Sequence, residues 1–320
     1  GDTASTDINC DQPSGYVADN TDCDDTNELV NPGAAEACDG LDTDCNAATS
    51  EDGLARFADS SSNITDYASI GSSSAPDTTP PSSAGTLTLC DGTYYMNWDL
   101  VDDLTVHSLN EDETAVFLDG GMAGAVLNLG DYTPYGSGYS LDLVLEDLTV
   151  TNGYLASDAG AFAAGVSCTE NGTASSVTVE NVVFEGNDGA LGDGGGAVFT
   201  YGCDLDMTDV EITSNASPYG AVFAQGSADL SITDSVFDSN ESLDTSALRI
   251  DLGSAYSAVL SGVDFYDNVS GENYSGGTVA LTNGGSALFD DVAVFSNSTT
   301  STNSGATSGV VHSASSELEW

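Results

Sequence analysis

The segment from Asp22 to Cys45 combines eight acidic residues with three cysteines in twenty-four positions and contains almost nothing apolar to bury. Hard divalent cations take six to eight oxygen ligands at about 2.3–2.6 Å, and carboxylates at alternate positions of a loop can converge on one such ion. The sequence therefore predicts a metal site, and the candidate ligands are Asp22, Asp24, Asp25, Glu36, Asp39, Asp42, Asp44 and Asp52.

The alternative interpretation of this segment is a solvated acidic surface that holds no ion. Four cysteines and a Pro-Gly turn favour the metal site, because a bare acidic run has little use for either; the cysteines are Cys10, Cys23, Cys38 and Cys45. Disulfides would hold together a segment too small for burial alone to stabilise. Four cysteines permit three connectivities, and their spacing does not choose between them. Calcium is the expected ion, with another divalent metal as the alternative, because the ligands are all oxygens and no histidine lies nearby.

Four short groups in this segment carry a family resemblance: DCDD (22–25), NPGA (31–34), EACDG (36–40) and LDTDC (41–45). They resemble the metal-binding motif family named after the surface protein MopE, which implies a metal-binding loop over about residues 7–53. Thr43 stands where the family usually has Asn, and Asn46 stands where Asp is frequent. The copper suggested by the family name has less support, because neither His107 nor His312 lies in the segment.

The charge balance excludes several classes of partner. The 320 residues include 52 acidic and 2 basic ones, which gives a formal net charge of −50. Nucleic-acid binding needs clustered Lys and Arg, and anionic lipid surfaces attract the same residues, so neither partner is expected. No apolar run approaches the roughly 18 residues that span a bilayer, so no membrane insertion is expected. Self-repulsion on this scale favours a saline or calcium-containing medium outside the cell.

The cysteine content and the start of the chain lead to the same expectation about location. Seven cysteines indicate an oxidising compartment. The sequence begins at Gly1 with no charged-then-apolar leader, which is compatible with a signal peptide already removed or with a trimmed chain. We therefore expect a secreted or cell-surface protein.

The second half of the chain repeats a seven-residue segment at intervals of 28, 25, 28 and 29 residues, measured between the final asparagines. The copies are NVVFEGN (181–187), DVEITSN (209–215), DSVFDSN (234–240), GVDFYDN (262–268) and DVAVFSN (291–297). Such a period, with short strands and no helical pattern, predicts a solenoid made of strands. The final asparagines tolerate the left-handed backbone of a sharp turn, and their amides can bond one coil away. We expect an internal ladder of Asn187, Asn215, Asn240, Asn268 and Asn297.

This repeat resembles the right-handed parallel β-helix of the pectate-lyase-like superfamily, over about residues 86–320. The expected fold is therefore all-β: a small acidic Cys-rich metal-binding module (1–53), a Ser/Pro-rich linker or crossing (54–85) and the parallel β-helix (86–320). The superfamily includes enzymes, adhesins and filament subunits, so the resemblance does not imply one function.

Three further features of the helix region bear on function. Cys168 and Cys203 occupy matching positions of adjacent coils, where a disulfide is feasible, which leaves Cys90 as a small buried hydrophobe. The first position of the repeat would stack one amide and three carboxylates in a column that Gly262 interrupts; these groups either recruit cations or only form turns. The residues are Asn181, Asp209, Asp234 and Asp291. Four repeat asparagines are also Asn-x-Ser/Thr triplets, as are Asn63, Asn171 and Asn273, but an internal ladder is the preferred role for the repeat copies.

Catalysis finds little support in the sequence. Arg249 is the only basic residue of the helix region, and an ion pair explains it without chemistry. We therefore expect a structural protein: a calcium-stabilised subunit of an extracellular fibre or coat, or a rod-like adhesin. The segment 308–320 stops where another coil would begin, so we expect either that the natural chain continues beyond Trp320 or that another subunit covers this end. For the second case the expected partner is a second copy of the chain, stacked end to end. The alternative is a β-helix that binds or hydrolyses a neutral polysaccharide through a groove, with a glycan as partner.

Overall fold

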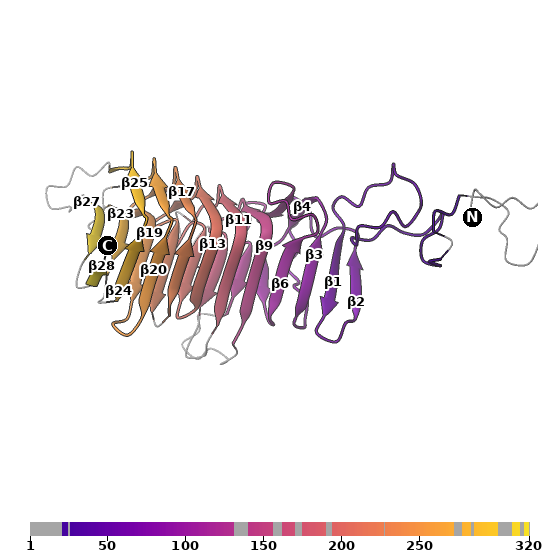
Figure 1. Cartoon of the computed structure of the whole chain (residues 1–320), viewed down its shortest axis with the longest axis horizontal. Coiled ribbons are helices and arrows are strands. Elements are labelled where there is room, and N and C mark those ends of the chain that lie inside the picture. Colours follow the sequence, from indigo (N-terminus) through magenta and orange to yellow (C-terminus); the bar gives the residue numbers. More distant parts are fainter. Residues whose placement is uncertain are drawn as a thin grey trace, which may run out of the picture.

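The computed structural model describes residues 21–24, 26–130, 140–155, 162–169, 175–189, 194–226, 228–271, 277–282, 285–299, 309–313 and 317–319. These residues form 28 strands and no helix, so none of them builds a helix that could cross a membrane. Figure 1 shows the strands side by side along an elongated rod, with the acidic N-terminal segment at one end. The predicted all-β fold is confirmed as a β-solenoid of about 6 turns.

Three sheets form the rod. The 16-stranded sheet contains β1 (Ala55–Asp59), β2 (Ile64–Tyr67), β3 (Gly85–Leu89), β4 (Gly92–Tyr95), β6 (Leu104–Ser108), β7 (Val116–Asp119), β9 (Asp142–Thr151), β11 (Ser176–Glu185), β13 (Asp204–Thr213), β16 (Leu230–Thr233), β17 (Val236–Asp238), β20 (Ser257–Ser261), β21 (Asp264–Tyr266), β24 (Ser286–Asp290), β25 (Ala293–Phe295) and β28 (Glu317–Glu319). The 8-stranded sheet contains β5 (Trp98–Leu100), β8 (Leu127–Leu129), β10 (Val166–Thr169), β12 (Val198–Tyr201), β15 (Val222–Gly226), β19 (Thr245–Leu252), β23 (Gly277–Leu281) and β27 (Gly309–Ser313). The 4-stranded sheet contains β14 (Ala216–Ser217), β18 (Glu241–Ser242), β22 (Val269–Ser270) and β26 (Ser298–Thr299).

Each C-terminal coil visits the sheets in the same order, as β20, β21, β22 and β23 show. The strands of these coils pair in parallel with their counterparts one coil away, with one shift of register between Thr245 and Leu248. Along β11 the side chains of Val177, Val179, Val182 and Phe184 are buried in the core. The interval of three between Val179 and Val182 breaks the alternation of two that a flat strand requires.

The first repeat position lies at that break and has a left-handed backbone. Asn181 has φ 52°, and Asp209, Asp234, Gly262 and Asp291 have φ 55°, 48°, 66° and 51° at the same place in later coils. Asn, Asp and Gly are the residues that adopt this left-handed conformation at least cost. The bend re-phases the strand so that both halves bury apolar side chains. The left-handed bend therefore explains why Asn, Asp and Gly occupy this position.

The asparagine ladder runs through the interior beside this bend. The Nδ2 of Asn187, Asn215, Asn240 and Asn268 donates to Oδ1 of the next asparagine at 3.0, 3.1, 2.9 and 2.9 Å, ending on Asn297. One expectation about it is wrong: the left-handed residue is the one before each asparagine, namely Gly186, Ser214, Ser239, Asp267 and Ser296. The preceding residue makes the turn, which leaves the asparagine free to point its amide along the rod axis.

The segment 54–85, expected as a linker or crossing, contains two strands of the main sheet. β1 pairs antiparallel with both β2 and β3, so these two strands extend the main sheet past the first coil. Farther along, Ile70 is buried in the core, and Asp77 accepts a hydrogen bond from Trp98 Nε1 at 3.2 Å. Composition alone suggested a spacer because the stabilising partners of this segment lie elsewhere in the chain.

Candidate metal centre

The acidic segment folds as an irregular loop at the N-terminal end of the rod. Within it, carboxylate oxygens of Glu36, Asp42 and Asp44 lie within 4.8 Å of one another. Two oxygens bound to one calcium ion at 2.3–2.6 Å can be separated by up to about 5 Å, so this spacing fits a shared cation. The donors are all oxygens, which suits a hard divalent ion.

Hydrogen bonds to the backbone give the loop its shape. The backbone N–H of Asp44 donates to Glu36 Oε1 at 2.7 Å, which draws the two ends of the segment 36–44 together. Asn46 N–H donates to Oδ1 of both Asp42 and Asp44 at 2.9 Å. These bonds hold three acidic side chains close to one another, although their charges repel in the absence of a cation.

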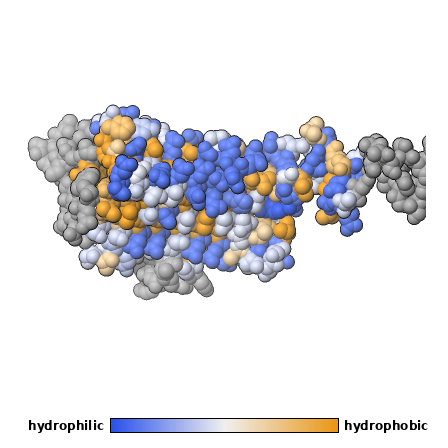
Figure 2. All heavy atoms as spheres, in the orientation of Figure 1, coloured by the Kyte–Doolittle hydropathy of each residue, from blue (hydrophilic) through white to orange (hydrophobic). Residues whose placement is uncertain are grey.

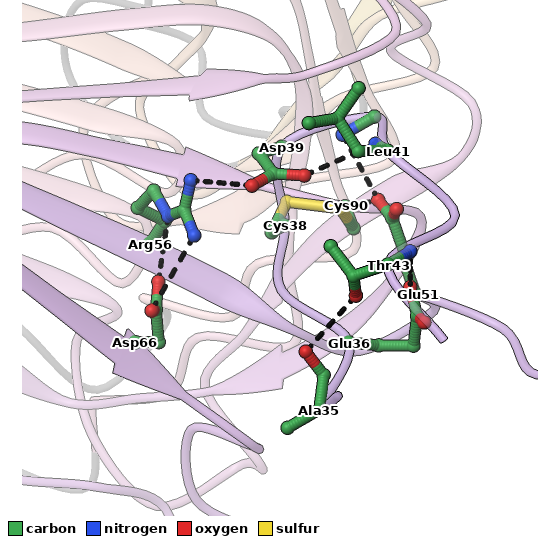
Figure 3. Close-up of polar contacts among 11 residues, drawn as sticks. Ala35, Glu36, Cys38, Asp39, Leu41, Thr43, Glu51, Arg56, Asp66 and Cys90 are labelled. Carbon is green, nitrogen blue, oxygen red and sulfur yellow. Dashed lines mark hydrogen bonds and ion pairs between the residues drawn. A yellow bond between two sulfur atoms is a disulfide. The ribbon is translucent and has the colours of Figure 1, made fainter. Parts of the chain in front are cut away.

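Thr43, the departure from the family pattern, has a structural role between two of these carboxylates. Its hydroxyl donates to Ala35 O at 3.0 Å, as Figure 3 shows. Its carbonyl accepts from Asn31 N–H at 2.8 Å, and its side chain is buried. Thr43 is therefore buried, whereas Asp42 is exposed and Asp44 is half-buried.

Among the described residues, four predicted ligands lie outside this group: Asp22, Asp24, Asp39 and Asp52. Asp22 accepts from Asp24 N–H at 3.0 Å, and Asp24 accepts from Thr26 Oγ1 at 2.6 Å. The Thr26 hydroxyl lowers the pKa of Asp24. Asp39 faces away, toward an arginine, and Asp52 is exposed outside the cluster. Asp25 and Cys10 lie outside the described residues.

Arg56 joins the acidic loop to the first strands of the rod (Figure 3). Its Nη1 lies 2.8 Å from Asp39 Oδ2, and its Nε lies 2.7 Å from Asp66 Oδ1. Asp39 belongs to the loop, Arg56 to β1 and Asp66 to β2. Asp39, a predicted ligand, therefore forms an ion pair that joins the loop to the rod.

One of the disulfides joins the acidic segment covalently to the rod. Cys23 is bonded to Cys45 inside the loop, but Cys38 is bonded to Cys90, the residue that follows β3. The expectation that Cys90 is unpaired is wrong. Spacing within the acidic segment cannot reveal this bond, because the partner cysteine lies 52 residues farther along the chain, beyond β3. The third disulfide joins Cys168 and Cys203, the pair expected from adjacent coils.

Glu51 is an acidic residue of this region that sequence reasoning missed. Its Oε2 accepts from Gly40 N–H at 3.2 Å. Burial raises the pKa of Glu51, and the nearby carboxylates of Asp39 and Glu36 raise it further. Glu51 lies at the end of the acidic segment, and this position could have indicated it. A pattern of alternating aspartates does not include it.

Comparisons with known proteins agree with this geometry. A family model described as "Putative metal-binding motif" matches residues 22–51, the segment that contains the converging carboxylates and Glu51. No curated protein and no solved structure matches the chain. The likeness of the rod to the pectate-lyase-like superfamily stays an expectation. The chain thus combines a metal-binding motif with a β-solenoid, and its disulfides are typical of an extracellular or periplasmic protein.

Proposed function

We propose that this chain is an extracellular structural protein: a β-helical rod whose acidic loop binds calcium at one end. One observation carries the proposal. Glu36, Asp42 and Asp44 converge within a segment that matches a metal-binding family, and Cys38–Cys90 attaches that segment covalently to the rod. A bound calcium ion would supply positive charge where three carboxylates meet and would hold both ends of the segment 36–44.

The rod itself favours a structural role over chemistry. Its core is a continuous stack of side chains from successive coils, and the asparagine ladder satisfies polar groups inside it. Both arginines are in ion pairs, Arg56 with Asp39 and Asp66, and Arg249 with Asp244 at 2.9 Å. The described positive charges therefore serve the fold.

Contact between copies belongs to the same proposal, as in a surface fibre, coat or adhesin. Figure 2 shows hydrophilic residues over much of one face of the rod, with hydrophobic side chains interspersed. On the C-terminal coils Val259, Leu288 and Phe295 are exposed on β20, β24 and β25. Apolar side chains on a chain of net charge −50 offer a surface where two copies can approach with less repulsion.

The aromatic cluster beside Arg249 does not favour a polysaccharide site. Phe199 and Phe223 pack against each other with ring centroids 5.3 Å apart and are 3% and 5% exposed. The guanidinium of Arg249 lies 4.9 Å from the Phe223 centroid and covers that ring. Rings covered in this way cannot stack on a sugar, so these residues act as packing.

Calorimetry and thermal unfolding of the full chain test the proposal. Calcium should bind with measurable heat and raise Tm, and a concentration of 100 Kd should add about 2.7 kcal/mol to the free energy of unfolding. The variant E36Q/D44N should lose both effects. The matched control E185Q/D290N removes the same two charges from exposed positions on the rod and should keep them. An unmodified chain that shows neither heat nor a Tm shift would refute calcium binding.

Assembly is measured on the same samples by light scattering and electron microscopy. The expected result is end-to-end association that calcium promotes and the chelator EDTA reverses. Monomers alone at high concentration in calcium would remove the assembly part of the proposal and leave calcium binding intact.

A further inference from the structure

Among the described residues, one Asn-x-Ser/Thr triplet lies outside the repeats, and it consists of Asn63, Ile64 and Thr65. All three residues are exposed. Asn63 ends the turn that follows β1, and the other two residues begin β2. Asn-x-Ser/Thr is the acceptor motif for N-linked glycans, which need a surface position in an exported chain. This triplet therefore has the position that the modification requires.

The amide hydrogens separate this triplet from those of the repeat. A side-chain amide has two N–H donors, and a glycosidic bond to Nδ2 replaces one of them. Asn63 Nδ2 donates to Asp59 Oδ2 at 2.7 Å, its one acceptor in the described part of the chain. One hydrogen can therefore be replaced while the other keeps the bond to Asp59. By contrast, Asn240 is fully buried, and both of its amide hydrogens have acceptors, Ile212 O and Asn268 Oδ1.

The triplet also lies on an edge of the main sheet. β2 is the first strand in the order of that sheet, and its partner among the described strands is β1 (Figure 1). Ile64, at the start of β2, is 54% exposed. An exposed edge with an apolar side chain invites pairing with another chain, and proteins commonly cover such edges. The turn before it is fixed, because Asn63 N–H donates to Asp59 Oδ1 at 2.8 Å. A group attached to Asn63 is therefore held beside this edge.

We propose that Asn63 carries an N-linked glycan, which covers the edge of β2 that lies opposite β1. The donor is an oligosaccharide on a polyprenyl diphosphate. The bond between its anomeric carbon and the diphosphate oxygen breaks, a bond forms between that carbon and Asn63 Nδ2, and Nδ2 releases one proton. Ser and Thr share a hydroxyl at the third position of the motif, so the Thr65 hydroxyl is the group that the transferring enzyme recognises. The proposal shares with the proposed function only the location outside the cell.

The first experiment maps glycan transfer on the folded full chain. Unmodified, disulfide-bonded protein is incubated with a purified oligosaccharyltransferase and a lipid-linked oligosaccharide, and the products are mapped by peptide mass analysis. Occupancy of Asn63 should exceed that of Asn215, Asn240 and Asn268 by about tenfold or more, because a ladder amide must first lose its buried hydrogen bonds. The same mapping on protein from its natural source should find the glycan on Asn63. An unmodified Asn63 in either sample would overturn the proposal.

Variants of the triplet separate recognition from folding. Thr65→Val keeps the shape and the strand propensity of the side chain but removes its hydroxyl, so transfer to Asn63 should be lost. Thr65→Ser should restore it. Asn110→Gln changes an exposed asparagine that belongs to no triplet and should leave the occupancy of Asn63 unchanged. Transfer that persists in Thr65→Val would contradict the assigned recognition.

The second experiment tests whether the glycan covers β2. Light scattering compares the glycosylated and unmodified chains in EDTA, which removes association that depends on calcium. The buffer contains about 1 M salt, where the Debye length is about 3 Å and the net negative charge is screened. The unmodified chain should associate at a lower protein concentration than the glycosylated chain, and Ile64→Thr should remove this difference. Equal association of the two chains would refute the covering role. Calcium binding is measured separately, so its failure would refute the proposed function and leave this result standing.

Discussion

The central asparagine of the ladder offers the sharpest test of how the rod is stabilised. Asn240 is fully buried; its Nδ2 donates to Asn268 Oδ1 at 2.9 Å and to Ile212 O at 2.8 Å. Its Oδ1 accepts from the backbone N–H of Asn215 at 3.0 Å. We predict that Asn240→Ala lowers the free energy of unfolding substantially without changing the backbone, because the left-handed residue is Ser239.

The magnitude follows from the groups that lose their partner. The backbone N–H of Asn215 and the Ile212 carbonyl each lose a bond inside the core. A buried polar group left unsatisfied costs about 1–3 kcal/mol, so the expected loss is about 2–6 kcal/mol. Asn297, at the end of the described ladder, is only half-buried, so water can replace its amide and Asn297→Ala should cost less.

The assay is equilibrium unfolding in guanidinium chloride followed by circular dichroism, with amide hydrogen exchange at Asn215 as a local measurement. Asn110→Ala is the control: that asparagine is exposed and donates to Asp91 Oδ1 at 2.9 Å, so its loss should cost less than about 1 kcal/mol. If the two variants unfold alike and Asn215 keeps its protection, the ladder does not stabilise the rod.

Three further predictions concern other parts of the molecule. Replacing Cys38 and Cys90 together with alanine opens a loop of sequence separation 52, and should cost about 4 kcal/mol of unfolding free energy, read as a lower Tm. Burial raises the pKa of Tyr94 in the folded chain. The protonated phenol therefore contributes fully to folding stability below the ordinary pKa of about 10, and this stability is lost as the pH rises through the folded pKa. Tyr94→Phe should therefore flatten the fall in Tm at alkaline pH. Arg249→Met leaves the mostly buried carboxylate of Asp244 without its arginine and should cost about 3–5 kcal/mol, part of which Asp244→Asn should restore in the double variant.

The parts of the fold that repeat could be predicted from the sequence. Asn187, Asn215 and Asn240 recur at the same place in each coil, so a regular spacing identified the coil length and the ladder together. The pairing of β1 with β2 and β3 could not be predicted from the repeat spacing. It depends on an antiparallel partner, β3, that does not repeat.

The same logic explains the Asn-x-Ser triplets of the repeat. Ser217, Ser242 and Ser270 pair in register on β14, β18 and β22 and are 2%, 3% and 1% exposed. Each lies two residues after a ladder asparagine. Two buried columns, one of amides and one of hydroxyls, therefore produce the triplet as a consequence of the fold. The motif resembles a glycan acceptor only because the coil needs these residue types at this spacing.

The candidate site was predicted less completely than the fold. A pattern of alternating carboxylates correctly indicated Asp42 and Asp44 as neighbours, and Glu36 reaches them only through the backbone turn that Asp44 N–H makes. Asp39 has the same residue type and comparable spacing, yet it pairs with Arg56. Spacing cannot separate a ligand from an ion-pair partner, because the arginine comes from another strand.

The distribution of carboxylates along the rod indicates where a cation matters. Asp204 accepts the backbone N–H of Asp229 at 2.9 Å, and Asp229 accepts that of Ser257 at 3.0 Å. These carboxylates lie one to a coil, and each stabilises the start of the next coil by a charge-assisted hydrogen bond. In the acidic loop, by contrast, three carboxylates meet within 4.8 Å. Repulsion between carboxylates grows as they approach, so a bound cation reduces the repulsion in the loop far more than the repulsion along the rod. Removing calcium should therefore increase hydrogen exchange in the loop and leave the exchange of β11 and β13 unchanged.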